Sequence, residues 1–267
     1  MRKYHDPRRP LRKALATLLM PTALTLASCS LPGSATGQLG QDQATLAACS
    51  GEQLATMVTI DVSGSGRSQS IADARLKVVS DEVRRTAICG GHLLVTAFDG
   101  TSAVTKPLFD GELHAPGATA IARLRRVPAM VETTMATITK GYQAVLAGPS
   151  MSDGSDITGQ YRLAGEYEAQ LGKSYTLNFV LLTDGFQTNG ADAITHALHG
   201  DDAQDLAEKV DLPTLKGATV TVAGLGDVTG TPPSSDIVQG LVQFYNAICA
   251  RTHAAKCVSV TDFTVGR

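Results

Sequence analysis

The chain of 267 residues is 43% hydrophobic and 18% charged, which is enough apolar material for one sizeable core. With six Tyr, six Phe and no Trp, that core must be built mainly from aliphatic side chains. The formal net charge is −2, and it becomes −7 once the six basic residues and one acidic residue of positions 1–28 are removed. This balance argues against nucleic acid or an anionic surface as the main partner.

The N-terminus has the pattern of an export signal. Six basic residues between Arg2 and Lys13 precede an apolar run from Ala14 to Ala27, which is too short to remain as a membrane-spanning helix. The run ends in Leu-Ala-Ser-Cys29, which resembles the bacterial lipobox, in which the Cys is lipidated and becomes the new N-terminus. We therefore expect residues 1–28 to be a lipoprotein signal peptide.

Lipidation at Cys29 would anchor the protein in the cell envelope, at the outer side of the cytoplasmic membrane or in the outer membrane. A plain secretory signal with a chance Cys is the alternative interpretation. Arg8-Arg9 only partly resembles a twin-arginine signal, so the export route stays open.

After the signal, residues 29–48 are rich in Gly, Ser, Gln and Ala and show no apolar period, which predicts a flexible tether. The domain itself is expected over residues 49–267. A first buried strand is predicted at 54–62, followed by a helix at 71–88 and a second strand at 92–98. Residues 103–109, which carry Pro107, suit an edge strand.

The second half continues the alternation of strands and helices. A Pro-Gly turn at 116–121 enters a long helical pattern to residue 145, which Pro128 should kink or split. Residues 149–174 look like a polar insertion with one short helix near 161–171. Later strands are predicted at 175–182, 218–224 and 257–260, and later helices at 203–210 and from a cap at Ser235 or Asp236. The pattern predicts an α/β fold, a doubly wound, mostly parallel sheet with helices on both faces and one antiparallel edge strand.

Four cysteines follow Cys29, and an even number without Cys-x-x-Cys spacing in an exported chain indicates two disulfides rather than a metal site. Cys49 precedes the first strand and Cys89 ends the first helix, so both lie where strands start and helices end. Cys249 and Cys257 are related in the same way at the last helix and strand. The predicted pairs are Cys49–Cys89 and Cys249–Cys257, although sequence alone allows three connectivities.

Oxygen-bearing side chains gather at three points of the predicted sheet. Asp61, Ser63 and Ser65 follow the first strand, Thr119 lies in the turn before the long helix, and Asp184 follows a later strand in Thr-Asp-Gly. Open α/β sheets bind their ligands at the carboxyl ends of strands, and oxygen donors suit a hard cation such as Mg²⁺.

These residues resemble the pattern of the von Willebrand factor type A (vWA) domain and its metal-ion-dependent adhesion site. That pattern is Asp-x-Ser-x-Ser, then a Thr in a Gly-rich turn before a helix, then an Asp in Thr-Asp-Gly. The resemblance covers residues 50–267. It implies a Mg²⁺ or Mn²⁺ held by Asp61, Ser63, Ser65, Thr119 and Asp184, with an open position for an Asp or Glu carboxylate of a protein ligand. Two departures are Gly66, where the family often has a larger apolar residue, and the length of residues 149–174.

Two other functions fit the same residues. A metal-dependent hydrolase could use the carboxylates to activate water, but no Gly-x-Ser-x-Gly elbow and no general base can be assigned. A structural subunit of an envelope complex could use the metal for assembly. His196 with His199 lacks a third metal ligand, and Gly224-Leu225-Gly226 lacks the spacing of a dinucleotide loop. The sequence thus favours a lipid-anchored, metal-dependent protein-binding domain that is not an enzyme.

Overall fold

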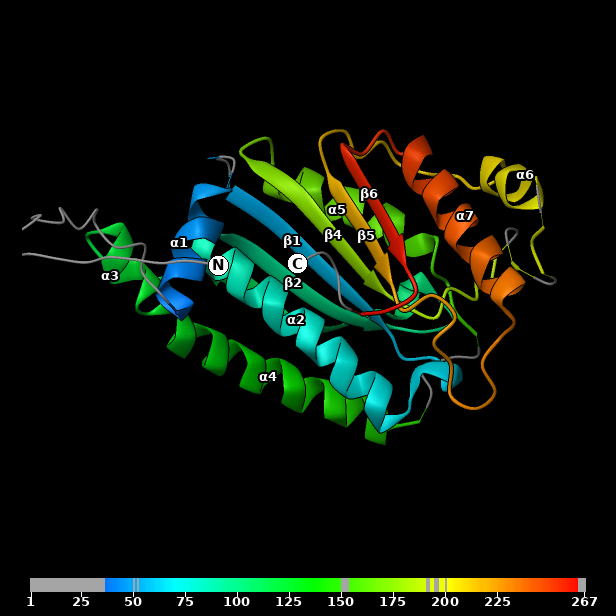
Figure 1. Ribbon diagram of the computed structural model, residues 1–267, viewed down its shortest axis with the longest axis horizontal. Helices are drawn as coiled ribbons and strands as arrows, with labels where there is room; N and C mark the ends of the chain where they lie inside the picture. The colour runs from blue at the N-terminus through cyan, green and yellow to red at the C-terminus, as the bar shows by residue number, and fades with distance from the viewer. Residues whose placement is uncertain are drawn as a thin grey trace, which may run out of the picture. The chain divides into compact units, whose positions relative to one another are not determined.

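A six-stranded sheet forms the centre of the computed structural model (Figure 1), which describes residues 37–49, 51, 53–149, 154–190, 193–194, 197–199 and 201–263. Its strands are β1 (Gln53–Asp61), β2 (Gly91–Phe98), β3 (Lys106–Leu113), β4 (Tyr175–Leu182), β5 (Thr219–Ala223) and β6 (Lys256–Val260). They lie in the order β3-β2-β1-β4-β5-β6, and only the β2–β3 pair is antiparallel. This is the doubly wound, mostly parallel α/β sheet that was predicted, and it is consistent with a vWA or Rossmann-like fold.

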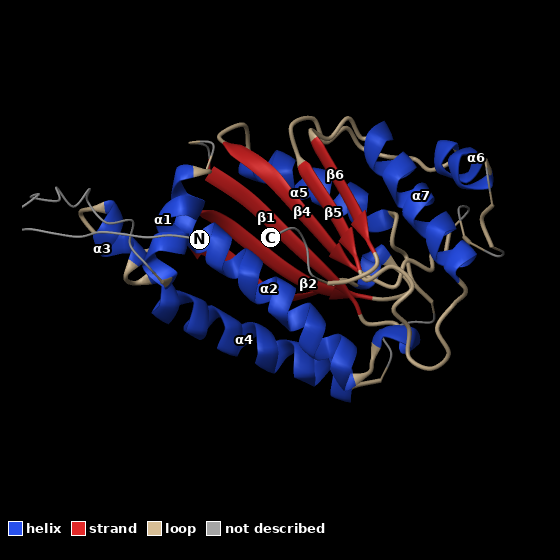
Figure 2. Cartoon of the chain, in the orientation of Figure 1, coloured by secondary structure: helices blue, strands red, loops and turns tan. Residues whose placement is uncertain are grey.

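Helices cover both faces of the sheet (Figure 2). They are α1 (Gln38–Ala47), α2 (Gln69–Cys89), α3 (Ala120–Leu124), α4 (Val127–Ala147), α5 (Gly159–Leu171), α6 (Asp202–Glu208) and α7 (Ser235–Arg251). One core packs α2 and α4 against β1 and β2, and the other packs α5 and α7 against β1, β4 and β5. None of the helices in the described part of the chain is both long and apolar enough to cross a membrane.

The strand β1 is buried on both faces because it lies in the middle of the sheet. Ala55 and Met57 belong to the core under α5 and α7, whereas Val58 and Ile60 belong to the core under α2 and α4. All four side chains are at most 1% exposed. The nearly unbroken apolar run of this strand is what a parallel strand with helices on both sides requires.

Residues 29–48 are not a flexible tether throughout, because residues 38–47 form α1. Asp42 is only 2% exposed, and both its carboxylate oxygens accept hydrogen bonds from Arg84 of α2, at 2.9 and 2.7 Å. Leu39 and Leu46 pack against the core on the α2 side of the sheet. The domain therefore begins before Cys49, and Cys29 lies outside the described residues.

Residues 149–174 are also not a polar insertion. Within them, α5 carries Tyr161 and Ala164, both fully buried, and Tyr167, which is 6% exposed, on one face against the sheet. The spacing of three residues between them is the pattern of a core helix. This segment supplies part of one of the two helical layers.

One expectation about element boundaries is confirmed and two are shifted. Pro128 stands in the first turn of α4, so the long helical pattern is split into α3 and α4, one of the two outcomes expected. The edge strand runs over 106–113 rather than 103–109. It begins later than expected because residues 102–104 form a 3₁₀ turn. The last helix is preceded by Ser234 as N-cap, one residue earlier than expected.

Both predicted disulfides are present: Cys49–Cys89 and Cys249–Cys257. The first joins the residue after α1 to the end of α2, and the second joins the end of α7 to β6. All four residues lie at the sheet end where the parallel strands start, as the pairing argument required. The bridges close segments of 40 and 8 residues.

Each bridge restricts the conformational entropy of the unfolded chain, and the restriction is greater for the longer loop. Removing a bridge should therefore lower the free energy of unfolding, and more so for the longer loop. We expect Cys49→Ser/Cys89→Ser to lower the free energy of unfolding by about 4 kcal/mol and Cys249→Ser/Cys257→Ser by about 2.5 kcal/mol. Urea unfolding of the two double variants beside the native protein measures both. A larger loss for the shorter loop would contradict the entropic account.

Candidate functional site

The carboxyl ends of β1 and β4 lie side by side in the middle of the sheet. Ile60 pairs with Leu182, so Asp61 and the Thr183-Asp184 dipeptide that follows β4 leave the sheet together. The chain continues from β1 through α2 to β2 on one side, while β4 lies on the other. This is the point of an open α/β sheet where the strand order reverses, and such points form ligand-binding crevices.

Asp61 is fully buried and held at both carboxylate oxygens. Its Oδ1 accepts a hydrogen bond of 2.9 Å from the backbone N–H of Ser63, and its Oδ2 accepts one of 2.7 Å from the Thr183 hydroxyl. The first bond tightens the turn that carries the serines. The second joins the end of β1 to the end of β4.

Ser63, Ser65 and Asp184 form a continuous row of oxygens. The hydroxyls of Ser63 and Ser65 are 3.4 Å apart, and the Ser65 hydroxyl donates to Oδ2 of Asp184. Oδ1 of Asp184 accepts from the backbone N–H of Phe186 at 3.0 Å. Four of the five predicted site residues therefore converge.

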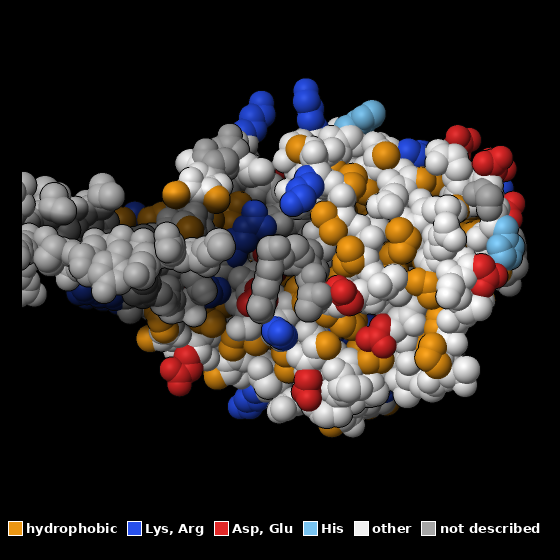
Figure 3. Space-filling view, in the orientation of Figure 1, with side chains coloured by type: hydrophobic (Ala, Val, Ile, Leu, Met, Phe, Trp, Pro, Cys, Tyr) orange, Lys and Arg blue, Asp and Glu red, His pale blue; other side chains and the backbone are white. Residues whose placement is uncertain are grey.

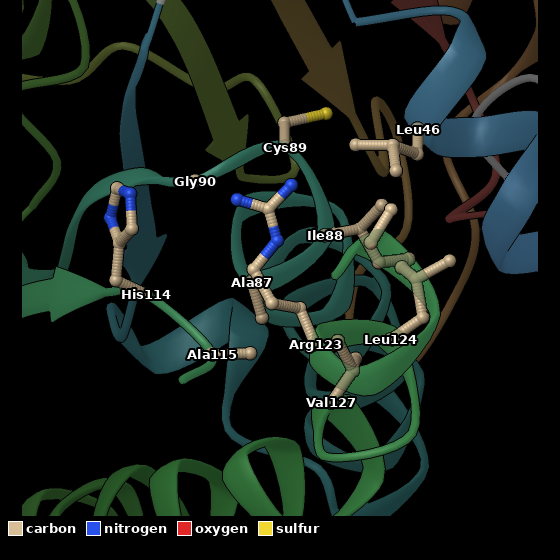
Figure 4. Close-up of a pocket in the computed structure, with 11 residues that line it drawn as sticks. Leu46, Ala87, Ile88, Cys89, Gly90, His114, Ala115, Arg123, Leu124 and Val127 are labelled. Carbon is tan, nitrogen blue, oxygen red and sulfur yellow. The ribbon is translucent and has the colours of Figure 1, made fainter. Parts of the chain in front are cut away.

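Thr119 does not join them. It is exposed, and its hydroxyl caps the short helix α3 by accepting from the N–H of Ala122 at 3.2 Å. Its turn follows β3, whose last residue pairs with Gly91, the first residue of β2. Arg123 of α3 lines a cavity of about 40 Å³ with Cys89 and Gly90, at the end of the sheet opposite Asp61 (Figure 4). The assignment of Thr119 to the site is not supported.

Ser155, rather than Thr119, places a hydroxyl beside Asp61. It is 3% exposed, and its Oγ lies 3.5 Å from Oδ1 of Asp61. It lies in residues 149–174, whose polar composition predicts an insertion, so the sequence did not point to it. A signal was available: Gly154 and Ser155 stand in a Gly- and hydroxyl-rich turn that opens α5, the same kind of signal that pointed to Thr119.

The loop that carries Ser155 is fixed to the loop that follows Asp184. The N–H of Ser155 donates to the Thr188 hydroxyl at 2.7 Å, and the N–H of Thr188 donates back to the Ser155 carbonyl at 3.1 Å. Gln187, fully buried, accepts from the N–H groups of Ile157 and Thr158 with one side-chain oxygen. Ser155 and Asp184 are thus positioned as one unit.

The Gly224-Leu225-Gly226 turn braces the site from the other side. The N–H of Gly226 donates to the carbonyl of Asp184 at 2.8 Å, and the N–H of Thr229 donates to that of Ser65 at 2.7 Å. This turn supports the loops rather than resembling a phosphate cradle. His196, half of the weak histidine pair, lies outside the described residues.

The side chains that converge are two carboxylates and three hydroxyls, all hard oxygen donors of the kind that Mg²⁺ and Mn²⁺ prefer. No group of three or more His, Cys, Asp or Glu side chains suited to a metal occurs in the described ranges. A cation here would depend on the hydroxyls of Ser63, Ser65 and Ser155 in addition to Asp61 and Asp184. The residues present therefore fit the expected ion, with Ser155 in place of Thr119.

The two carboxylates are close enough to affect one another. Burial, with the neighbouring Asp61 carboxylate, raises the pKa of Asp184 from 3.8 to about 6, whereas hydrogen bonds from Ser65 and Phe186 and the charge of Arg75 lower it. The ionised form of the site is thus unfavourable without a cation, which is the electrostatic condition for binding one.

No known family model and no curated protein matches the chain. Similar solved structures include BatB, a conserved hypothetical protein from Bacteroides thetaiotaomicron, with 13% identity and a TM-score of 0.40, over 78% of this chain and 89% of that one. They also include the pilus adhesin SpaC of Lactobacillus rhamnosus GG, with 12% identity and a TM-score of 0.42, over 79% of this chain and 28% of that one. The manganese-loaded TRAP protein of Plasmodium vivax has 10% identity and a TM-score of 0.38, over 72% of this chain and 63% of that one. Likeness at this level assigns no function.

The raised pKa of Asp184 predicts how the stability of the metal-free protein depends on pH. Between pH 4 and 6 the folded state binds more protons than the unfolded state, so the free energy of unfolding should fall as pH rises through this window. The loss should be roughly 2–3 kcal/mol, the equivalent of about two pKa units. Thermal unfolding in chelator at pH 4 and pH 7.5 measures it.

Asp184→Asn should remove most of this pH dependence and raise the melting temperature of the metal-free protein at pH 7.5. Asp211→Asn, at an exposed position, is the matched control and should behave like the native protein. Equal pH dependence in native protein and Asp184→Asn would contradict the assignment of the raised pKa to Asp184.

Proposed function

We propose that the chain is an exported, lipid-anchored, vWA-type domain that binds a protein ligand through a Mg²⁺ or Mn²⁺ ion. The observation that carries the proposal is the convergence of five oxygen-bearing side chains from three loops at the carboxyl edge of β1 and β4. They are Asp61, Ser63, Ser65, Ser155 and Asp184.

The ligand set explains why the ion would favour an anionic partner. A divalent ion held largely by neutral hydroxyls keeps much of its charge and attracts a carboxylate into an open coordination position. Ser63, Ser65 and Ser155 supply the neutral oxygens. The protein ligand is therefore expected to present an Asp or Glu side chain.

Three of the four histidines in the described part of the chain lie away from the site. His92 is the second residue of β2, His114 follows the end of β3, and His253 follows the end of α7. All three are at the sheet end opposite Asp61. Hydrolysis of a bound substrate would need a general base beside the ion in addition to the ion's own ligands, and these three histidines are not placed to serve. The fourth, His199, is exposed and interacts with Asp236 at the start of α7.

The visible surface suits a protein partner better than a polyanion. In the coloured part of the face seen in Figure 3, basic and acidic side chains are spread among neutral and apolar ones without forming one continuous basic patch. Nucleic-acid binding rests on such a patch. A single carboxylate recognised by a metal ion needs none.

The metal proposal predicts which variants lose the ion. Calorimetric titration should give one Mn²⁺ or Mg²⁺ per chain, and Asp61→Ala and Asp184→Ala should abolish binding because each removes charge that offsets the ion's. Ser155→Ala should weaken binding by about tenfold, since water replaces a lost hydroxyl ligand. Ser65→Ala should be similarly mild.

Thr119→Ala is the matched control, because it removes a hydroxyl from the opposite end of the sheet. It should bind the ion like the native protein. If Thr119→Ala lost the ion and Ser155→Ala kept it, the proposed ligand set would be wrong, and no binding by the native protein would end the metal proposal. The same variants serve as baits in envelope extract, where capture of a partner should vanish in chelator and with Asp61→Ala.

The anchor has its own test. Cys29→Ala should abolish labelling by a fatty-acid analogue and release the protein from the membrane fraction, because the lipid is the expected attachment. Cys49→Ser/Cys89→Ser, which keeps Cys29, should remain labelled. Native protein that is exported, unlabelled and soluble would overturn the proposed anchor.

A further inference from the structure

Arg75 of α2 is a fully buried cation close to the two carboxylates of the site. It is 0% exposed and is among the largest side chains that the fold buries completely. Its Nε and Nη2 make no hydrogen bond of normal geometry among the described residues, and the buried Tyr142 hydroxyl of α4 lies close to the guanidinium. A buried guanidinium is costly, and an apolar side chain of similar size would often stabilise the same core better. Its position therefore calls for an explanation beyond packing.

One nitrogen of Arg75 holds both ends of the turn that carries the serines. Its Nη1 donates to the carbonyl of Asp61 and, at 3.0 Å, to the carbonyl of Gly66. Ser63 and Ser65 lie between these two carbonyls. The guanidinium thus closes the turn from inside the protein.

Gly66 is shaped to this guanidinium. A Cβ at position 66 would lie 2.7 Å from both Nη1 and Nη2 of Arg75, closer than real Cβ contacts come. The backbone of Gly66 is not in the left-handed region, so conformational freedom does not require a glycine here. A glycine is required here because Arg75 approaches the backbone so closely. The buried Arg75 therefore explains why a glycine, and not a larger residue, follows Ser65.

The aromatic ring of Phe263 completes the enclosure. It lies over the guanidinium, with Cζ of Arg75 5.8 Å from the ring centroid. Phe263 follows β6 in the chain. Its ring makes a cation–π interaction with Arg75, and such an interaction is strongest when the cation is shielded from water. Arg75 is therefore held in one place by Asp61, Gly66 and Phe263.

We propose that Arg75 is a positioning residue of the metal site, which orders the turn from Asp61 to Gly66 so that Ser63 and Ser65 converge with Asp184. This inference rests on the proposed function for its metal readout only. The order that Arg75 imposes on the turn exists in the metal-free protein and can be measured there.

The charge of Arg75 and its ordering of the turn have opposite expected effects on metal binding, so an experiment can separate them. Arg75 is a positive charge beside a cation site, so removing it should strengthen metal binding if charge were its main effect. If Arg75 acts by ordering the turn, removing it weakens binding although it removes a repulsive charge.

The experiment compares Arg75→Met and Arg75→Lys with the native protein, in chelator and in a titration with Mn²⁺. In chelator, we expect amide hydrogen exchange at Val62, Ser63 and Gly66 to be at least about tenfold faster in both variants, because the two carbonyl bonds that close the turn are lost or reduced. With Mn²⁺, affinity should fall by about tenfold or more, the usual effect of losing a group that orients metal ligands.

Arg84→Met is the matched control, since it removes an arginine of the same helix that pairs with Asp42 far from the turn. It should leave both readouts at the native values. Should Arg75→Met fail to fold, Gly66→Ala tests the same contact, because it displaces the guanidinium while keeping its charge. It should speed exchange and weaken Mn²⁺ binding as well.

Native exchange rates in Arg75→Met, or in Gly66→Ala if Arg75→Met does not fold, would overturn the positioning role. So would tighter Mn²⁺ binding by Arg75→Met. If the native protein binds no Mn²⁺ but the exchange rates change as expected, the proposed function fails while the ordering of the turn by Arg75 stands.

Discussion

Two buried carboxylates on neighbouring strands are the constraint on which the rest of the site depends. Asp61 and Asp184 are at most 1% exposed and carry like charge at the ends of β1 and β4. Burying them together is unfavourable unless hydrogen bonds and a cation offset the cost. The surrounding loops supply the hydrogen bonds, through the hydroxyls of Thr183 and Ser65 and the N–H groups of Ser63 and Phe186. Each of these contacts also fixes an oxygen donor in place.

Much of the fold and four of the site residues could be predicted because they depend on local pattern. Strands buried on both faces produce unbroken apolar runs, and Asp61 and Asp184 follow directly from the ends of two such runs. The disulfides could be paired because strand starts and helix ends share one side of a parallel sheet. Ser155 and α1 depend instead on contacts between distant segments. The helix α1 has little apolar pattern of its own and is held by the Asp42–Arg84 ion pair and by the bridge to Cys89.

The error at Thr119 has a topological cause. An antiparallel edge strand returns the chain to the end of the sheet where the parallel strands start, so the turn that follows it lies far from the carboxyl ends. The 21 residues of α4 span about 30 Å, enough to carry the chain back across the sheet. The next loop, which contains Ser155, therefore lies beside Asp61. The expectation of an antiparallel strand and the assignment of Thr119 to the site were in conflict, and the chain direction decides between them.

The buried guanidinium adds a fixed charge to this arrangement. Asp61 and Asp184, when both are ionised, and Arg75 together carry a net charge of −1, so a bound divalent ion would bring the group to +1. A site of that charge attracts a partner's carboxylate at the surface while its own carboxylates remain paired below. Without Arg75 the same ion would leave the group neutral and the attraction weaker. If the proposed ion binds, Arg75 would therefore favour an acidic ligand as well as hold the turn that carries Ser63 and Ser65.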